Sequence, residues 1–322
     1  MAFHDKSLIL FVYIFTFITG LPANLFAFAT FVRQVQRRPS PVAVLLLNLT
    51  VSDLLLLIFL PFKMAEAAAD MTWPLPAFLC ALTNYCYYSS IYLSTFLLMA
   101  VSVERYLGVA FPVQYKLRRR PAYAVAASAA FWVLACSHCS IVFISEAQAP
   151  SANATNISQC YNDFSVDQLR VVLPVRLELF LFLFCLPFAI TVFCYVNFVR
   201  ILLALPNIPR RKKCRAVGLA LATLANFMVC FAPYNISHVV GFVNNESPPW
   251  RIYALLLSTF NASLDPIIFY FSSSAVQKAL VGSWLVLRNR LYAAVPRCYC
   301  LRGGREDQAG NGDEVEAEGS ST

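Results

Sequence analysis

The chain has 322 residues, of which 59% are hydrophobic and only 13% are charged. A soluble globular domain carries about 25% charged residues, so this composition excludes a soluble enzyme and a disordered chain, and 10 Gly are too few for a collagen-like fibre. The remaining class is a protein that crosses the membrane several times. The surplus of 25 Lys and Arg over 17 Asp and Glu favours anionic lipid or a cytoplasmic partner over nucleic acid.

Seven apolar segments follow one another along the chain, each with at most one charged or histidine side chain: 7–32, 41–62, 71–103, 121–145, 179–199, 216–245 and 252–277. About 20 apolar residues form a helix that spans a bilayer. The sequence therefore predicts an all-α membrane protein, with an extracellular N-terminus at 1–7 and a seven-transmembrane helix bundle at 8–272. A short amphipathic eighth helix is expected at 273–291, followed by a disordered cytoplasmic tail at 292–322.

Basic side chains predict the orientation of the bundle, because they accumulate in cytoplasmic loops. Clusters of Lys and Arg lie at 33–38, 116–120 and 210–215, in the loops after the first, third and fifth spans. The loops between them are poor in bases. We therefore expect a multi-pass protein of the plasma membrane, with its N-terminus outside the cell and its C-terminus in the cytoplasm.

Several residues outside the spans are candidates for covalent modification. Asn153-Ala-Thr and Asn156-Ile-Ser form glycosylation sequons in the loop after the fourth span. Cys80 at the start of the third span and Cys160 in the same loop face the oxidising exterior, so a disulfide between them is expected. The tail contains two candidate palmitoylation sites, Cys298 and Cys300. The alternative is an unmodified tail.

Charged side chains inside spans are energetically costly and indicate function. Asp53 lies in the second span and Asp265 in the seventh, and Glu104-Arg105-Tyr106 ends the third span at its cytoplasmic face. Prolines also interrupt three spans, where each removes a backbone hydrogen bond and is expected to kink the helix; they are Pro187, Pro233 and Pro266.

In this order and on these spans, the features resemble those of the rhodopsin-like G-protein-coupled receptors, over about residues 7–290. Further matching residues are Asn24, Cys80, Trp132, Tyr195 and Phe227. Three positions depart from the usual pattern, namely Asp265, Phe269 and Phe231. The resemblance implies a receptor that performs no covalent chemistry, so an enzyme is not expected.

The resemblance also implies partners and a possible ion. In this family the arginine that ends the third span, here Arg105, controls docking of a heterotrimeric G protein, and the residues around it are Glu104, Tyr106 and Tyr195. We expect coupling to Gi/o with Gq as a second option, arrestin as a further partner, and no nucleic acid. The family's sodium site would be formed by Asp53, Asp265, Asn24 and Asn261. The alternative is that the two aspartates hydrogen-bond to each other with one protonated. No other cofactor or metal is expected.

Longer strings are similar to the free fatty acid receptors for short-chain carboxylates. They are Glu104-Arg-Tyr-Leu-Gly-Val-Ala-Phe-Pro-Val-Gln-Tyr-Lys-Leu, Leu173-Pro-Val-Arg-Leu-Glu-Leu, Pro233-Tyr-Asn-Ile-Ser-His-Val-Val-Gly and Asn261-Ala-Ser-Leu-Asp-Pro. The similarity implies a ligand of the acetate, propionate and butyrate class. It also implies a set of ligand-binding residues: Arg176, Arg251, His238, Tyr234, His138 and Tyr88.

The residues themselves support an anion site. Arg176 lies 11 residues outward of Pro187, His238 lies five residues outward of Pro233, and Arg251 opens the seventh span. A guanidinium cannot lose its proton and its planar fork suits a carboxylate. The alternatives are arginines that reach the lipid headgroups and, for His138, a satisfied core histidine. At the level of function, the alternatives are a carboxylate transporter and a receptor for another anionic, lipid-like ligand.

Overall fold

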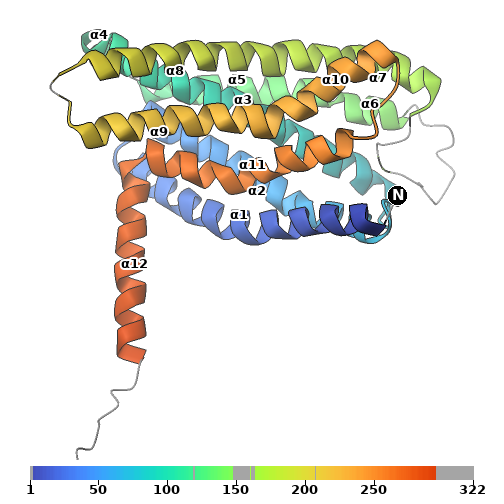
Figure 1. Ribbon diagram of the computed structural model, residues 1–322, viewed down its shortest axis with the longest axis horizontal. Helices are drawn as coiled ribbons and strands as arrows, with labels where there is room; N and C mark the ends of the chain where they lie inside the picture. Colours follow the sequence, from blue (N-terminus) through green and yellow to red (C-terminus); the bar gives the residue numbers. More distant parts are fainter. Residues whose placement is uncertain (1–2, 119, 148–159, 161–163, 207, 295–322) are drawn as a thin grey trace, which may run out of the picture. The chain divides into compact units, whose positions relative to one another are not determined.

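The computed structural model describes residues 3–118, 120–147, 160, 164–206 and 208–294. Every regular element among these residues is a helix, and seven helical segments are long and apolar enough to cross a membrane. The prediction of an all-α bundle with seven spans is confirmed (Figure 1). The chain divides into two compact units, residues 1–280 and 281–322.

The first four spans are each built on one long helix. Their helices are α1 (Phe3–Arg37), α2 (Pro41–Ala68), α3 (Ala77–Ala110) and α5 (Pro121–Cys139). Short helices follow the third and fourth of these, namely α4 (Pro112–Arg118) and α6 (Ile141–Ala147). Two helices start on side-chain signals in the sequence: Ser40 caps α2 by accepting a hydrogen bond from the Ala43 amide, and Ser165 forms a capping box with Gln168.

The fifth and sixth spans each contain a π-helical segment next to their proline. The fifth consists of α7 (Val166–Glu178), η1 (Leu179–Cys185) and α8 (Leu186–Ala204). The sixth consists of α9 (Arg210–Asn226), η2 (Phe227–Phe231) and α10 (Ala232–Asn244). Pro187 and Pro233 follow these widened turns, whereas Pro266 lies inside the continuous α11 (Arg251–Ser272). At Pro187 and Pro233 the helix therefore accommodates the missing backbone N–H group by widening a turn, and it does not end there.

Some helix ends differ from the predicted boundaries. α1 begins at Phe3, so residues 3–7 are helical, and α12 (Ser274–Ala294) starts after the single non-helical Ser273. α2 continues to Ala68 and buries Lys63 and Glu66, which form an ion pair of 2.9 Å inside the bundle. The tail from residue 295 onward, with Cys298 and Cys300, lies outside the described residues.

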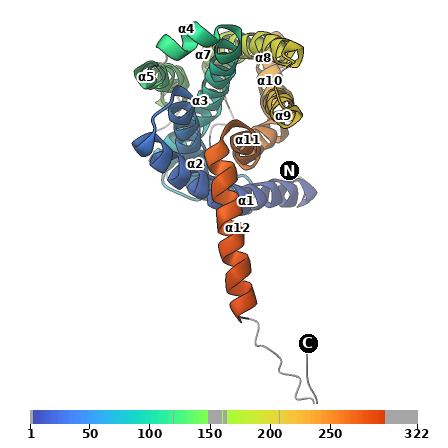
Figure 2. The same ribbon diagram turned by 90° about the vertical axis from the view of Figure 1, so that its left-hand side faces the viewer.

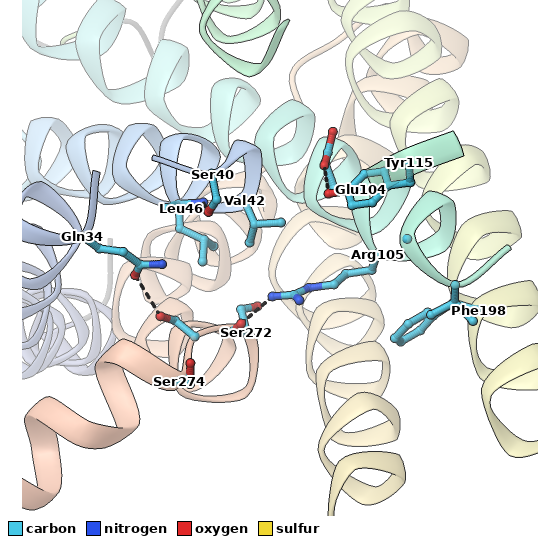
Figure 3. Close-up of a pocket in the computed structure, with 14 residues that line it drawn as sticks. Gln34, Ser40, Val42, Leu46, Glu104, Arg105, Tyr115, Phe198, Ser272 and Ser274 are labelled. Carbon is cyan, nitrogen blue, oxygen red and sulfur yellow. Dashed lines mark hydrogen bonds between the residues drawn. The ribbon is translucent and has the colours of Figure 1, made fainter. Parts of the chain in front are cut away.

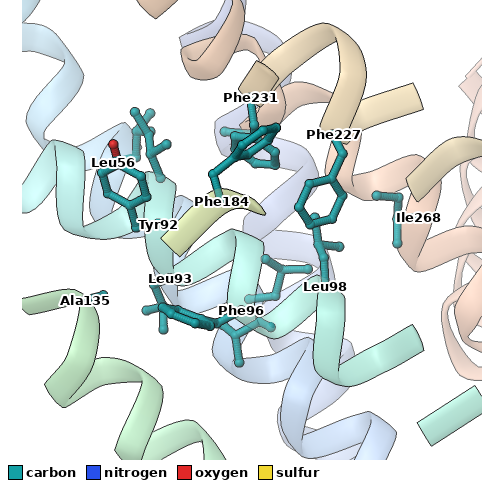
Figure 4. Close-up of a cluster of buried hydrophobic side chains, with 14 of the residues drawn as sticks. Leu56, Tyr92, Leu93, Phe96, Leu98, Ala135, Phe184, Phe227, Phe231 and Ile268 are labelled. Carbon is teal, nitrogen blue, oxygen red and sulfur yellow. The ribbon is translucent and has the colours of Figure 1, made fainter. Parts of the chain in front are cut away.

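α3 forms the centre of the bundle. It contacts α2, α5 and α8, and it is the most deeply buried of the seven spans; in Figure 2 the spans are seen nearly end-on around it. A cluster of aromatic rings fills the interior, including Phe184, Phe227 and Phe231 (Figure 4). The rings of Phe227 and Phe231 pack edge to face with centroids 5.6 Å apart, a favourable geometry for aromatic pairs. The sixth span thus packs on the core through the two phenylalanines at the ends of its widened turn.

Candidate functional site

At the end of the bundle that is predicted to face outward, here called the outer part, five of the six predicted ligand-binding residues line one small cavity. Tyr88 comes from α3, Arg176 from α7, Tyr234 and His238 from α10, and Arg251 from the first turn of α11. All five are at most 6% exposed. The two arginines are therefore buried in protein, which argues against their reaching the lipid headgroups.

Arg251 is held against two tyrosine rings. Its Nη2 donates a hydrogen bond of 2.7 Å to Tyr234 Oη, and its Cζ lies 5.1 Å from the ring centroid of Tyr234 and 5.8 Å from that of Tyr88. The two tyrosine rings stack with centroids 6.0 Å apart. Because cations are attracted to the faces of aromatic rings, these contacts fix the guanidinium at the cavity wall.

His238 lies between two tyrosines on the same side of the cavity. Its ring packs edge to face on Tyr234 at 4.7 Å, and its Nε2 shares a hydrogen bond of 2.8 Å with Tyr92 Oη. The other ring nitrogen, Nδ1, is buried and makes no hydrogen bond within the described part of the chain. The imidazole is thus oriented through one nitrogen, which leaves the other available to a ligand.

Arg176 is anchored from outside the spans. Its Nη1 donates a hydrogen bond of 3.2 Å to Ser247 Oγ, in the segment between α10 and α11, and its Cζ lies 4.8 Å from the ring centroid of Phe164, just before α7. The cavity therefore carries a second guanidinium, which contacts segments outside the helices through Ser247 and Phe164.

The cavity between these residues has a volume of ≈ 10 Å³. About 10–15 Å³ is needed to hold one water molecule, and even acetate is larger than water. Its remaining walls come from α3, the end of α5, α6 and η1: Tyr92, Cys139, Ile141, Val142 and Leu179. The site in this structure combines cationic, hydrogen-bonding and apolar walls but is closed.

His138, the sixth predicted residue, faces a different cavity. Its Nδ1 lies 2.8 Å from Leu134 O and its Nε2 lies 2.9 Å from Glu178 Oε1, in a groove of ≈ 320 Å³ at the surface of α5 and α7. Both ring nitrogens of His138 therefore have partners outside the cavity that the other five residues line. The structure does not bring His138 together with the other five residues.

A disulfide closes the outer face near the cavity. Cys80 at the start of α3 is bonded to Cys160, with Cα atoms 5.7 Å apart, which confirms the predicted pair. The bond ties the segment between α6 and α7 to the third span. The sequons at Asn153 and Asn156 lie outside the described residues.

At the inner end of the bundle, Glu104 and Arg105 line a cavity of ≈ 380 Å³ (Figure 3). Glu104 Oε2 accepts a hydrogen bond of 2.5 Å from Tyr115 Oη of α4. Arg105 Nη2 donates a hydrogen bond to the carbonyl of Ser272, the last residue of α11. The end of the third span is thereby connected to both α4 and the end of the seventh span.

The other two predicted signalling residues connect neighbouring spans at this end. The Tyr106 ring packs on Phe193 of α8, with centroids 5.8 Å apart. Tyr195 Oη, also on α8, shares a hydrogen bond of 3.3 Å with Thr223 Oγ1 of α9. These contacts join the third, fifth and sixth spans near their inner ends.

In the middle of the bundle, the two intramembrane aspartates lie in one polar cluster. Asp265 accepts hydrogen bonds from the side-chain amides of Asn226, at 3.0 Å, and Asn261, at 3.2 Å. Asp53 is buried in the same cluster, and its Oδ2 makes no hydrogen bond within the described residues. Two neighbouring carboxylates repel each other unless a proton or a cation offsets their charge, and these are the two alternatives expected from the sequence.

Asn24 is the fourth residue of the predicted sodium site. Its Nδ2 donates to Ala262 O at 2.8 Å, while its Oδ1 is buried and makes no hydrogen bond within the described residues. Carboxylate and amide oxygens are the ligands that hard cations prefer. The residues present are therefore chemically suited to a small cation.

Two site residues were missing from the sequence-based prediction. Tyr92 hydrogen-bonds His238, and its position four residues after Tyr88 on one helix face was an available signal. Asn226 completes the polar cluster around Asp265. It lies seven residues before Pro233 with the π-helical η2 between them, so α-helical periodicity does not relate the two positions.

Comparison with known proteins adds an independent result. The family model described as "7 transmembrane receptor (rhodopsin family)" matches residues 6–269. Free fatty acid receptor 2 of Homo sapiens is 54% identical over 288 residues, which cover 88% of this chain and 87% of that protein. Free fatty acid receptor 3 of Homo sapiens is 50% identical, over 85% of this chain and 81% of that protein. Free fatty acid receptor 1 of Macaca fascicularis is 38% identical, over 80% and 88%.

Proposed function

Because the chain belongs to the rhodopsin family of seven-transmembrane receptors, and within it to the free fatty acid receptors, we propose that it is activated by extracellular short-chain carboxylates. The family consists of receptors and not of enzymes. The observation that carries the proposal is the cavity that two buried guanidiniums, from Arg176 and Arg251, line together with three tyrosines and a histidine.

The chemistry of the cavity matches a small acid. Each guanidinium offers a planar fork of donors for a carboxylate, and Tyr234 and His238 add hydrogen bonds from the facing span. The acyl chain lies against Ile141, Val142 and Leu179. A closed cavity of ≈ 10 Å³ has no room for this ligand, so the ligand binds a more open conformation and raises its population.

The inner end of the bundle couples this change to a heterotrimeric G protein. Arg105 leaves its contact with the end of α11, and a helix of the G protein docks between the third, fifth and sixth spans. We propose Gi/o as the principal partner, Gq as a second, and arrestin as the protein that binds afterwards. The basic inner loops support an orientation with the N-terminus outside the cell, in the plasma membrane.

Two further parts of the proposal concern modification and ions. Asn153 and Asn156 carry glycans on the outer face, and Cys298 and Cys300 carry palmitate on the inner face. Asp53, Asp265, Asn24 and Asn261 would hold a sodium ion. The ion would supply the positive charge that offsets two neighbouring carboxylates. A dependence of propionate potency on sodium concentration that is lost in Asp53→Asn would support this site.

A ligand panel tests the proposed function. Membranes that contain the receptor and purified Gi are given acetate, propionate or butyrate, and nucleotide exchange is measured. The matched amides acetamide, propionamide and butyramide are the controls, because they keep the chain but lose the charge. The acids should stimulate exchange and the amides should not. Stimulation by a lysophospholipid alone would favour the other anionic ligand, and uptake of labelled propionate into vesicles would favour a transporter.

A further inference from the structure

The inner end of α11 presents four carbonyl groups that have no partner within their own helix. A helix always leaves its last four carbonyls in this state. The first two are satisfied locally: Phe269 O accepts from the Ser273 amide at 2.9 Å, and Tyr270 O accepts from Gln277 Nε2 at 2.9 Å. The last two depend on other spans.

Two arginines from neighbouring spans complete this helix end. Arg215 Nε of α9 donates a hydrogen bond of 2.6 Å to Phe271 O, and Arg105 of α3 donates to Ser272 O. The carbonyl end of a helix carries a partial negative charge, so cations are stabilised there. The sixth span is therefore attached to the seventh by an arginine that binds a main-chain carbonyl group.

A glycine brings the same two helices together three residues further along α9. A Cβ atom built on Gly218 would lie only 2.7 Å from Cε1 of the Phe271 ring. Real Cβ atoms essentially never approach another atom this closely, so any other residue would displace the Phe271 ring from its place against α9. α9 therefore contacts Phe271 at two points. Arg215 donates a hydrogen bond to its carbonyl group, and Gly218 packs closely against its ring.

We propose that Arg215, Gly218 and Phe271 form a latch that holds the inner ends of α9 and α11 together and keeps the receptor closed in the absence of ligand. Docking of a G protein between the third, fifth and sixth spans requires α9 to move away from α11. This movement removes the Arg215 donor from Phe271 O, a part-buried hydrogen bond whose loss costs free energy. The signalling consequence rests on the proposed function; the latch itself does not.

Two variants of the full chain test the latch from different sides. Arg215→Leu removes the donor, and Gly218→Ala inserts a methyl group against the Phe271 ring. An environment-sensitive fluorophore on Cys214, which is exposed on α9, reports opening directly in a Cys298→Ser, Cys300→Ser background. Without ligand, both variants should shift the fluorescence toward the value that wild type reaches with saturating propionate. Ligand-free nucleotide exchange should rise about tenfold, which corresponds to about 1.4 kcal/mol.

Matched controls separate the latch from general damage. Arg211→Leu removes the same charge from an exposed position on the same helix and should raise neither signal. In a Phe271→Leu background, Gly218→Ala should have no further effect, because the ring it displaces is gone. Unchanged or reduced ligand-free fluorescence and exchange in both latch variants, at wild-type surface level, would overturn the proposal. The latch variants could also shift the fluorescence while no protein, including wild type with propionate, shows nucleotide exchange. That result would support the latch and contradict the proposed coupling to a G protein.

Discussion

Tyr92 and His238 show how a single hydrogen bond can prepare a binding group. The 2.8 Å contact between Tyr92 Oη and His238 Nε2 fixes the plane of the imidazole and leaves Nδ1 available. A neutral imidazole contributes one hydrogen bond and no net charge, so its share of carboxylate binding is smaller than that of either guanidinium. The Tyr92 side chain also lines the cavity, and its hydroxyl group is bonded to this ring.

His238→Ala should therefore lower propionate potency by about fivefold to tenfold, as expected for one neutral hydrogen bond of about 1 kcal/mol. Tyr92→Phe should give a smaller loss of the same kind. Because both changes act on one group, the double variant should be no worse than His238→Ala alone. Concentration–response curves for the three variants provide the measurement. Losses that simply add would show that Tyr92 has a separate role.

The sequence could predict the principal side chains of the outer site but not how they are held. Arg176, His238 and Arg251 could be placed at one depth because helical rise and the proline positions define their distance along the spans. Ser247 and Phe164 anchor Arg176 from segments outside the helices, where no periodicity applies. His138 has the right depth as well, yet it faces Glu178 at the bundle surface, because depth alone does not define the direction of a side chain.

At the scale of helices, charge-free runs located all seven spans, yet missed parts of their ends. Lys63 and Glu66 end the apolar run of the second span, but α2 continues past both because they neutralise each other inside the bundle. Arg176 and Glu178 also interrupt the apolar run, so the prediction missed the first turns of the fifth span. Where a span ends in charged side chains, the position of its end depends on the residues that these side chains contact in the folded protein. An apolar run in the sequence gives no information about those contacts.

The disulfide between Cys80 and Cys160 should stabilise the arrangement of the outer segments around these helices. Its removal by Cys80→Ser with Cys160→Ser should destabilise the protein by about 2–5 kcal/mol, because the unfolded chain loses a constraint. A lower midpoint of thermal unfolding in detergent is the expected result. Cys136→Ser removes a free cysteine and is the matched control. Equal midpoints for the double variant and wild type would contradict this role.

For the molecule as a whole, the two ends of the bundle contain cavities of very different size. The outer cavity measures ≈ 10 Å³ and the inner cavity at Arg105 measures ≈ 380 Å³. The ligand site is therefore closed, although the inner end already has a hollow bounded by Glu104 and Ser272. Sequence could identify both ends from their motifs, whereas the state of the bundle follows from side-chain packing and needs a structure.

Arg105→Ala distinguishes the role of the inner end, in nucleotide exchange, from the role of the outer end, in ligand binding. The variant should lose nucleotide exchange on Gi, because Arg105 is proposed to contact the docked G protein. It should keep its ligand binding, because Arg105 lies at the opposite end of the bundle from the cavity at Arg251. Binding of labelled propionate and exchange are measured on the same membranes. Normal exchange at matched expression would remove Arg105 from the mechanism.

The central claim is that Arg176 and Arg251 together bind the ligand carboxylate, and concentration–response curves for acetate, propionate and butyrate test it most directly. A hydrogen bond to a charged group contributes about 1.5–3 kcal/mol, so Arg176→Ala and Arg251→Ala should each lower potency about tenfold to over a hundredfold. Lys at either position should restore part of the potency, because it restores charge without the fork. If both Ala variants reach the cell surface and respond like wild type, the carboxylate binds elsewhere.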